Sequence, residues 1–100
     1  MPVYMLFGNY TPEALRGISP DRTRQVAEIV EANGGKVQAM YAVMGEHDLV
    51  FIFDFPDQER ALMSSVAIER LTGIVLRTSP VVEVEKFDRL VGEAARVERL

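Results

Sequence analysis

The stretch KVQAMYAVMGEHDLVFIF, residues 36–53, predicts a β-hairpin. Residues 36–44 alternate along the chain with the period of two that is typical of a strand. One face of that strand would carry Val37, Ala39, Tyr41 and Val43, and the other Lys36, Gln38, Met40, Ala42 and Met44. Gly45–His47 predicts a tight turn, and residues 48–53 predict the returning strand. We therefore expect an antiparallel pair in the middle of the chain.

A strand and a helix are predicted on the N-terminal side of this hairpin. Residues 2–8 are rich in apolar and β-favouring side chains and end at a glycine, which predicts a strand. Residues 10–17 are expected to form a connection. Ser19 and Pro20 then predict a helix start, with serine as the N-cap and proline at the first helical position. The helix should stop at Asn33–Gly35, whose first glycine suits the left-handed position after a helix.

A second helix, a fourth strand and a third helix are predicted after the hairpin. Asp54, Pro56 and Asp57 interrupt the pattern and start the second helix. Its inner face is expected to contain Ala61, Leu62, Ser65, Ile68 and Leu71. Gly73 would end it, and residues 74–78 predict a strand. An amphipathic C-terminal helix is predicted from the helical spacing of Val84, Phe87, Leu90, Val91 and Ala94.

This order of elements predicts one α+β domain over residues 1–100. Two strand–helix–strand halves with right-handed crossovers give a four-stranded antiparallel sheet with both helices on one face. That arrangement is the ferredoxin-like βαββαβ fold, followed here by the C-terminal helix.

The central strands are apolar on both faces, which predicts a second cover for the sheet. Residues 49–53, 4–7 and 74–76 contain no polar side chain that would suit a solvated face. A large exposed apolar surface marks an interaction site. The simplest cover is a second copy packed sheet against sheet as a two-fold homodimer or a higher oligomer. The alternative is that the C-terminal helix alone closes a monomer.

Composition argues against several classes of function. The net charge is −4 and the pI about 4.9, so the chain lacks the cations that a nucleic-acid binder needs. Arg16, Arg22 and Arg24 are the nearest approach to a basic patch and are interpreted as a solvated helix face. Cysteine is absent, which removes disulfides and thiolate chemistry. The N-terminal residues have no basic region followed by a long apolar one, so we expect no signal peptide. No apolar run is long enough to span a bilayer, and we expect a cytoplasmic protein without a membrane partner.

A family resemblance extends over nearly the whole chain. It rests on Tyr4, Gly8, Tyr10–Glu13, Arg24, Gly34–Lys36, Tyr41, Gly45–Asp48, Pro56–Asp57, Thr78 and Phe87. This pattern resembles the GYD-domain family, although His47 stands where the family usually has tyrosine. The resemblance implies a dimeric α/β-barrel in which two ferredoxin-like sheets pack together. The turn is also similar to the Gly-x-x-Asp hairpin of the ligand-sensing domains of Lrp/AsnC regulators.

Seven residues are candidates for a functional site. His47 is the only histidine, and it is a candidate general base that Asp48 could orient. The alternative is that both are turn residues, with the Asp48 carboxylate accepting hydrogen bonds from N–H groups of the turn. A ligand pocket between sheet and helices would be lined by Tyr4, Asn9, Tyr10, Tyr41 and Arg77. One histidine beside one aspartate falls short of a metal site, and no cofactor is predicted.

Three functions are compatible with these residues. The first is a small homo-oligomeric protein that binds a small organic ligand in the pocket. The second is a cofactor-free oxygenase or isomerase that uses His47 as its base. The third is a stand-alone ligand-sensing module similar to those of Lrp/AsnC regulators. The fold alone does not choose among these activities, nor does it decide whether the protein is an enzyme.

Overall fold

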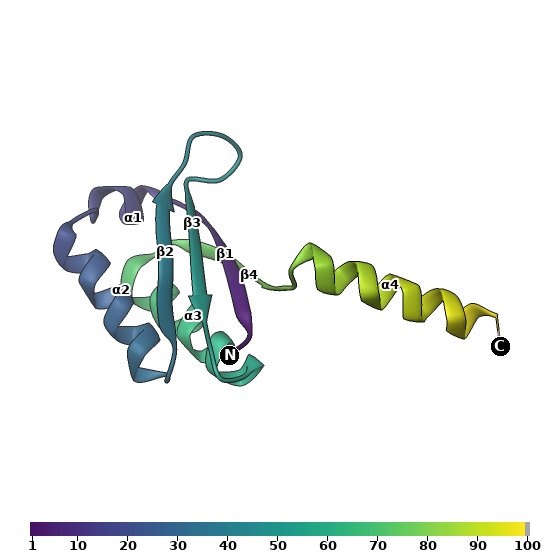
Figure 1. Cartoon of the computed structure of the whole chain (residues 1–100). Coiled ribbons are helices and arrows are strands. Elements are labelled where there is room, and N and C mark those ends of the chain that lie inside the picture. The colour runs from purple at the N-terminus through teal and green to yellow at the C-terminus, as the bar shows by residue number, and fades with distance from the viewer. Residues whose placement is uncertain (100) are drawn as a thin grey trace.

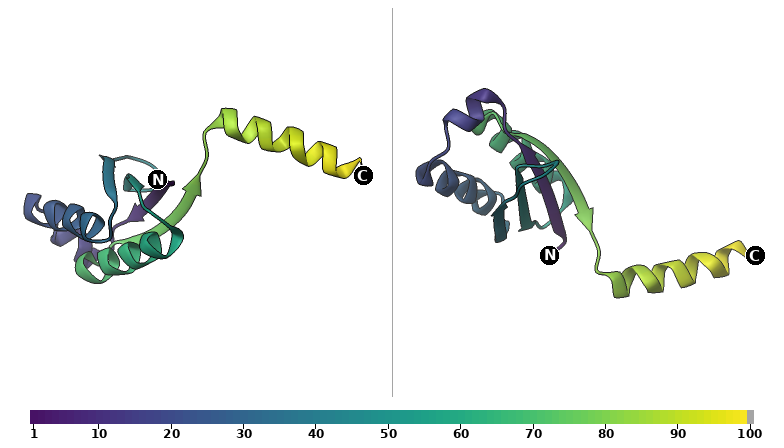
Figure 2. Two further views of the ribbon diagram at one scale, coloured as in Figure 1. Left: turned by 60° about the horizontal axis from the view of Figure 1, so that its bottom comes forward. Right: turned by 90° about the horizontal axis from the view of Figure 1, so that it is seen from above.

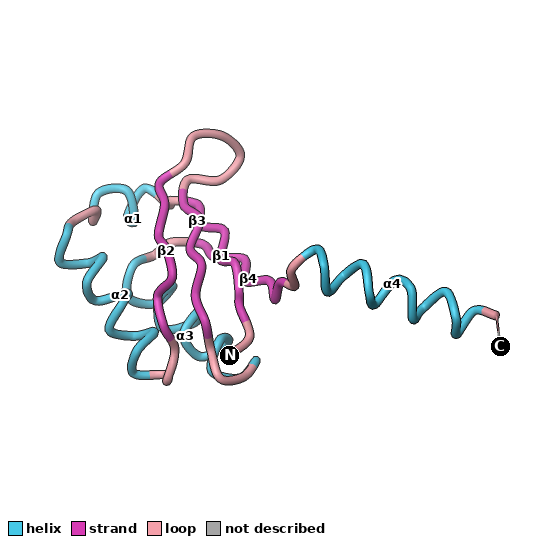
Figure 3. The backbone as a smooth tube through the Cα atoms, viewed as in Figure 1, coloured by secondary structure: helices cyan, strands magenta, loops and turns pink. Residues whose placement is uncertain are grey.

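The computed structural model describes residues 1–99 and confirms the predicted α+β architecture (Figure 1). Its elements are β1 (Val3–Asn9), α1 (Pro12–Arg16), α2 (Pro20–Ala32), β2 (Lys36–Ala42), β3 (Leu49–Asp54), α3 (Gln58–Thr72), β4 (Val75–Val81) and α4 (Val84–Glu98). The sheet order is β2-β3-β1-β4, and every neighbouring pair is antiparallel. This order is that of the ferredoxin-like fold, with each crossover skipping one strand (Figure 3).

Side-chain caps fix the helix ends that the sequence predicted. The Ser19 hydroxyl accepts a hydrogen bond from the Arg22 amide at 3.0 Å, and Pro20 opens α2. Gly34 follows α2 and Gly73 follows α3, with φ of 74° and 78°, in the left-handed region that favours glycine. The connection expected at residues 10–17 instead contains α1, which begins with the same cap-and-proline signal at Thr11 and Pro12.

The core lies between the sheet and helices α2 and α3, which cover the same face (Figure 2). Its fully buried side chains include Leu6 on β1, Phe53 on β3, Val30 on α2 and Ile68 on α3. Phe55, just after β3, is buried with them and meets the Phe53 ring edge-on at 6.1 Å. Each of these large side chains stabilises the fold by about 1.5–3 kcal/mol on burial.

A bulge in β2 changes the faces predicted for that strand. Val37 pairs with Phe53, but the next pair is Ala39 with Ile52, so Gln38 is the extra residue. The alternation is therefore shifted by one position, and Met40 joins Val37 against the core. The prediction that Tyr41 shares a face with Val37 is wrong. Tyr41 lies on the opposite face, and its side chain is 56% exposed.

The inner face of α3 also differs from the prediction. Ala61, Ser65 and Ile68 are buried as expected, but the helix turns Ser64 and Thr72 inward with them. Leu62 and Leu71, which were predicted to face the core, are instead exposed. The helix lies so close to the sheet that small side chains fill the contact, where the Ser65 and Thr78 hydroxyls hydrogen-bond at 2.6 Å. This helix therefore presents apolar side chains to solvent.

Within residues 1–99 no helix covers the sheet face opposite α2 and α3, so the second cover that the apolar strands predict is not supplied by the described part of the chain. Strand registers give this open face an apolar centre flanked by polar side chains, and its residues are Val3, Met5, Phe7, Asn9, Lys36, Ala39, Tyr41, Val50, Ile52, Asp54, Val75, Arg77, Ser79 and Val81. Helix α4 does not close it, because the helix projects from the end of β4 and buries none of its residues (Figures 1 and 2). The alternative of a monomer closed by the C-terminal helix is therefore wrong for this structure.

Candidate functional site

Asp48 joins the hairpin loop to the segment that follows β1. Its carboxylate Oδ2 accepts a hydrogen bond from the Tyr10 backbone N–H at 2.9 Å. Its own backbone N–H donates to the Gly8 carbonyl at 2.9 Å. The expectation that this carboxylate satisfies N–H groups of its own turn is therefore wrong, because its partner lies 38 residues away in the sequence. Asp48 holds Tyr10 in position.

His47 lies over the open face with its ring against Phe7, at a centroid distance of 5.0 Å. Its Nδ1 is 3.2 Å from Asn9 Oδ1, and Asn9 Nδ2 donates to the Glu46 carbonyl at 2.9 Å. Because a carbonyl only accepts, the Asn9 amide must turn its Oδ1 toward the histidine, so Nδ1 is the donor. In the neutral ring, Nε2 is then the unprotonated nitrogen.

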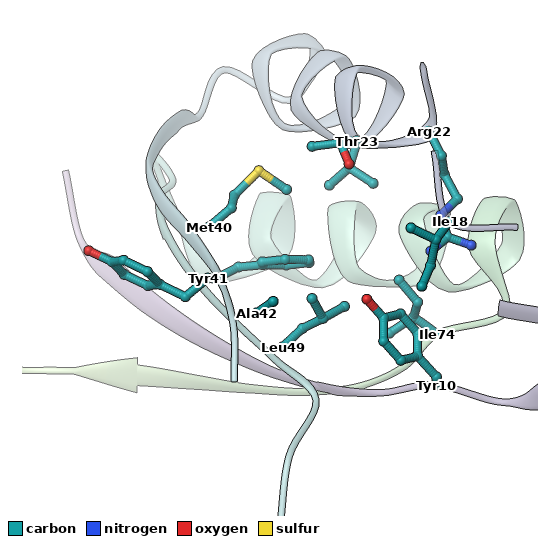
Figure 4. Close-up of a pocket in the computed structure, with 11 residues that line it drawn as sticks. Tyr10, Ile18, Arg22, Thr23, Met40, Tyr41, Ala42, Leu49 and Ile74 are labelled. Carbon is teal, nitrogen blue, oxygen red and sulfur yellow. The ribbon is translucent and has the colours of Figure 1, made fainter. Parts of the chain in front are cut away.

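A cavity of about 220 Å³ opens between α2 and the β2–β3 pair, at the end of the sheet where Tyr10 leaves β1. It is lined by Tyr10, Ile18, Arg22, Thr23, Val26, Met40, Tyr41, Ala42, Leu49, Phe51 and Ile74. Arg22, Thr23 and Tyr10 lie toward the same end of it, while the Tyr41 ring points away from the others (Figure 4). The cavity thus combines apolar walls with one cation and two hydroxyls at one end.

Arg22 is the one charged residue among those that line this cavity in the described chain. Its Nη1 donates to the Ala14 carbonyl of α1 at 2.5 Å, which holds the guanidinium in place. Among residues 1–99 the structure gives no carboxylate partner to Arg22, whereas Arg24 pairs with both Asp21 and Glu28. The hydrogen bond that Arg24 donates to the Asp21 carboxylate, followed by the charge of Glu28, raises the pKa of Arg24 above its usual value. Within residues 1–99 the Arg22 guanidinium makes one hydrogen bond, to the Ala14 carbonyl.

The structure divides the seven predicted residues among four places. Tyr10 and Tyr41 line the cavity, Tyr41 only at its margin. Tyr4 is buried elsewhere, with its ring 5.7 Å from Phe55. Asn9, His47 and Arg77 lie on the open face, and Asp48 supports Tyr10 from the loop.

Arg22 was missed because it was interpreted as part of a solvated face. Its position was readable, since Arg22, Val26 and Ile29 follow the i, i+4, i+7 spacing of one helix face. Arg24 lies away from that face. The solvated interpretation therefore holds for Arg24 and is wrong for Arg22, whose side chain is half-buried.

Comparison with known proteins gives the family. The model of the GYD domain matches residues 4–91. The chain belongs to the GYD domain family. No curated protein matched the chain in a sequence search.

Solved structures share the fold of this GYD domain. The Leucine response regulatory protein of Mycobacterium tuberculosis matches with a TM-score of 0.59 and 16% identity, over 82% of this chain and 51% of that protein. The crystal structure of a glutamate-to-alanine mutant matches with a TM-score of 0.60 and 14% identity, over 82% of this chain and 50% of the other. The GYD domain therefore spans about half the length of these two proteins.

A second hollow lies between α3 and β4 of the GYD domain and has a volume of about 490 Å³. We call it the α3–β4 groove, and it is lined by Tyr4, Gln58, Ala61, Leu62, Ser65, Val66, Glu69, Leu76, Thr78 and Pro80.

Residues 1–99 bring no three metal-ligating His, Cys, Asp or Glu side chains together. No helix within the same residues has the length and apolar composition needed to cross a membrane.

Proposed function

We propose that this GYD domain is a ligand-binding module whose cavity between α2 and the hairpin takes a small organic carboxylate. The observation that carries the proposal is Arg22, a half-buried cation without a carboxylate partner in the described chain, at the mouth of an apolar cavity. A guanidinium binds a carboxylate through two parallel N–H···O bonds. The ligand's carboxylate would lie beside Arg22, and its apolar part would lie against Val26, Phe51 and Leu49.

The size and polarity of the cavity restrict the ligand. At about 220 Å³ it is smaller than the 300–1,000 Å³ typical of sites for drug-sized molecules. This volume suits a small amino, hydroxy or keto acid. The hydroxyls of Tyr10 and Thr23 could select a polar substituent next to the carboxylate. A solved protein of the same fold is described as a leucine response regulator, which supports a sensing role for a ligand of this class.

Self-association through the open face belongs to the same proposal. Met5, Phe7, Val50 and Ile52 are apolar and lie side by side across the two central strands. An apolar patch of this kind on one face favours a two-fold contact with its own copy. Binding of the carboxylate beside β2 and β3 could change the packing of those strands and so the subunit number.

His47 supports a second candidate function, general base catalysis. The Asn9 amide fixes the tautomer that leaves Nε2 unprotonated in the neutral ring, which is the form that can accept a proton. Asp48 does not orient this ring, because its carboxylate is bonded to Tyr10. General base catalysis as a candidate function therefore rests on the His47–Asn9 pair alone, at the margin of the open face.

The proposal is tested by comparing Arg22→Gln with Arg24→Gln, an exposed arginine on the same helix. A panel of small amino, hydroxy and keto acids is screened by thermal shift, and hits are measured by calorimetry. Losing a charge-assisted contact of about 1.5–3 kcal/mol should weaken binding about 10- to 100-fold in Arg22→Gln. Arg24→Gln should bind as the parent does. Equal affinities in the two variants, or no binding by the parent, would overturn the assignment of this cavity.

A further inference from the structure

Helix α4 carries an apolar stripe that its own domain leaves uncovered. Val84, Phe87, Leu90 and Val91 are 46–72% exposed, and Val97 continues the stripe. A 15-residue helix with one apolar side is stabilised mainly by packing that side against a partner. The two residues between β4 and α4 carry the helix away from the sheet (Figure 2). The stripe therefore needs an occupant from outside its own domain.

The α3–β4 groove is a second uncovered apolar surface on the same chain. Leu62 is 64% exposed and Val66 43%, although both are large apolar side chains, and the face of α3 that is buried beside them carries the small residues Ala61, Ser64 and Ser65. The floor is formed by Leu76 and Pro80 of β4. Apolar side chains placed outward in this way indicate a surface that binds another helix.

The two surfaces match in length and in charge. The groove extends along α3 from Gln58 to Glu69, about 16 Å, and the stripe from Val84 to Ala94 is about 15 Å long. Glu69 is the one charged residue among the described residues that line the groove. Glu69 Oε2 already accepts a hydrogen bond from the Leu76 backbone N–H at 3.1 Å. Lys86 lies at the edge of the stripe, one residue before Phe87, and is the cation that would pair with the other oxygen of that carboxylate.

We infer that α4 of one copy of this chain lies in the α3–β4 groove of a second copy. A membrane surface is a poor alternative, because the described part of α4 carries four carboxylates against three cations and anionic lipids would repel it. Docking in the groove leaves the open face free, so this contact adds to the sheet-to-sheet contact. The inference is also independent of any ligand in the cavity between α2 and the β2–β3 pair.

Cysteine cross-linking tests the inference cleanly, because the chain has no cysteine of its own. Leu62→Cys is placed in one copy and Val91→Cys in a second copy that carries a mass tag. Val91 is near the middle of α4 and Leu62 near the middle of the groove, so they meet whichever way the helix points. The mixed proteins are oxidised at micromolar concentration and separated without reductant. Arg89→Cys, on the polar side of α4, is the matched control.

The expected result is a tagged–untagged disulfide dimer that forms about 10- to 100-fold faster with Val91→Cys than with Arg89→Cys, because docking raises the local concentration. Equal rates would overturn the inference. Tagged–tagged dimers of Val91→Cys in place of the mixed product would assign the stripe to helix–helix pairing instead. A double variant that cross-links within one chain would assign α4 to its own groove. If Leu62→Cys fails to fold, Val66→Cys replaces it in the same groove.

Discussion

Replacement of Asp48 by alanine should destabilise the domain by removing the bond that holds Tyr10. The Asp48 carboxylate accepts from the Tyr10 N–H at 2.9 Å, in a half-buried position. Hydrogen bonds to charged groups contribute about 1.5–3 kcal/mol. Because the carboxylate keeps some contact with solvent, the expected loss in the free energy of unfolding is at the low end, about 1.5–2 kcal/mol. Asp48→Asn keeps an acceptor without the charge and should lose about half as much.

Urea and thermal unfolding give the assay for this effect. A domain of this size has an unfolding entropy near 0.2 kcal/mol/K, so a loss of about 2 kcal/mol lowers the melting temperature by about 10 °C. Asp88→Ala is the control, because it removes the same charge from exposed α4. It should change the unfolding free energy by less than about 0.5 kcal/mol.

The same replacement tests how the site is positioned. Tyr10 lines the cavity between α2 and the β2–β3 pair, so releasing its backbone should weaken carboxylate binding there as well as lower the free energy of unfolding. If Asp48→Ala unfolds at the same urea concentration as Asp88→Ala, the hydrogen bond to Tyr10 contributes nothing measurable. The structural role assigned to Asp48 would then be wrong.

Three further substitutions test other parts of the structure. Ile52→Arg puts a charge on the open face and should lower the sedimentation coefficient toward that of a smaller species. A sedimentation coefficient equal to that of the parent protein would argue against sheet-to-sheet association. Ser64→Ala should raise the free energy of unfolding, measured in urea, by about 0.5–2 kcal/mol, because the buried Ser64 hydroxyl has no hydrogen-bond partner among residues 1–99. A less stable variant would show that the Ser64 hydroxyl does make a stabilising hydrogen bond. His47→Ala should lower the melting temperature by a few degrees and leave carboxylate binding intact. A loss of 10²- to 10⁴-fold in any measured turnover would instead make His47 the base.

The fold was predictable because its signals are local. Ser19, Pro20 and Gly34 act on the backbone within one helical turn, so their effect can be interpreted without knowing the tertiary structure. The need for a second cover was equally predictable, since a sheet whose strands are apolar on both faces must be covered on both faces. The position of Tyr41 was not predictable, because the bulge at Gln38 depends on the register between β2 and β3.

The candidate site was only partly predictable, for a different reason. Tyr10 was found because it directly follows a strand, and the end of a strand beside a helix is a common place for a cavity. Arg22 was missed because its charge was given more weight than its position on the apolar side of α2. The role proposed for Arg22 depends on its hydrogen bond to the Ala14 carbonyl of α1, a contact between two helices that no local sequence pattern indicates.

The wrong predictions about burial on α3 have a different physical origin from that of Tyr41. Leu62 and Leu71 on α3 were expected to pack inward, and each is exposed in the isolated chain, as is Phe87 on the apolar side of α4. Apolar spacing reports that a side chain is buried somewhere, without saying which molecule covers it. The open face, the α3–β4 groove and the stripe of α4 are three such surfaces on 100 residues. If copies of the chain cover one another at these surfaces, the burial pattern in the sequence describes the assembly, and the single domain is one part of it.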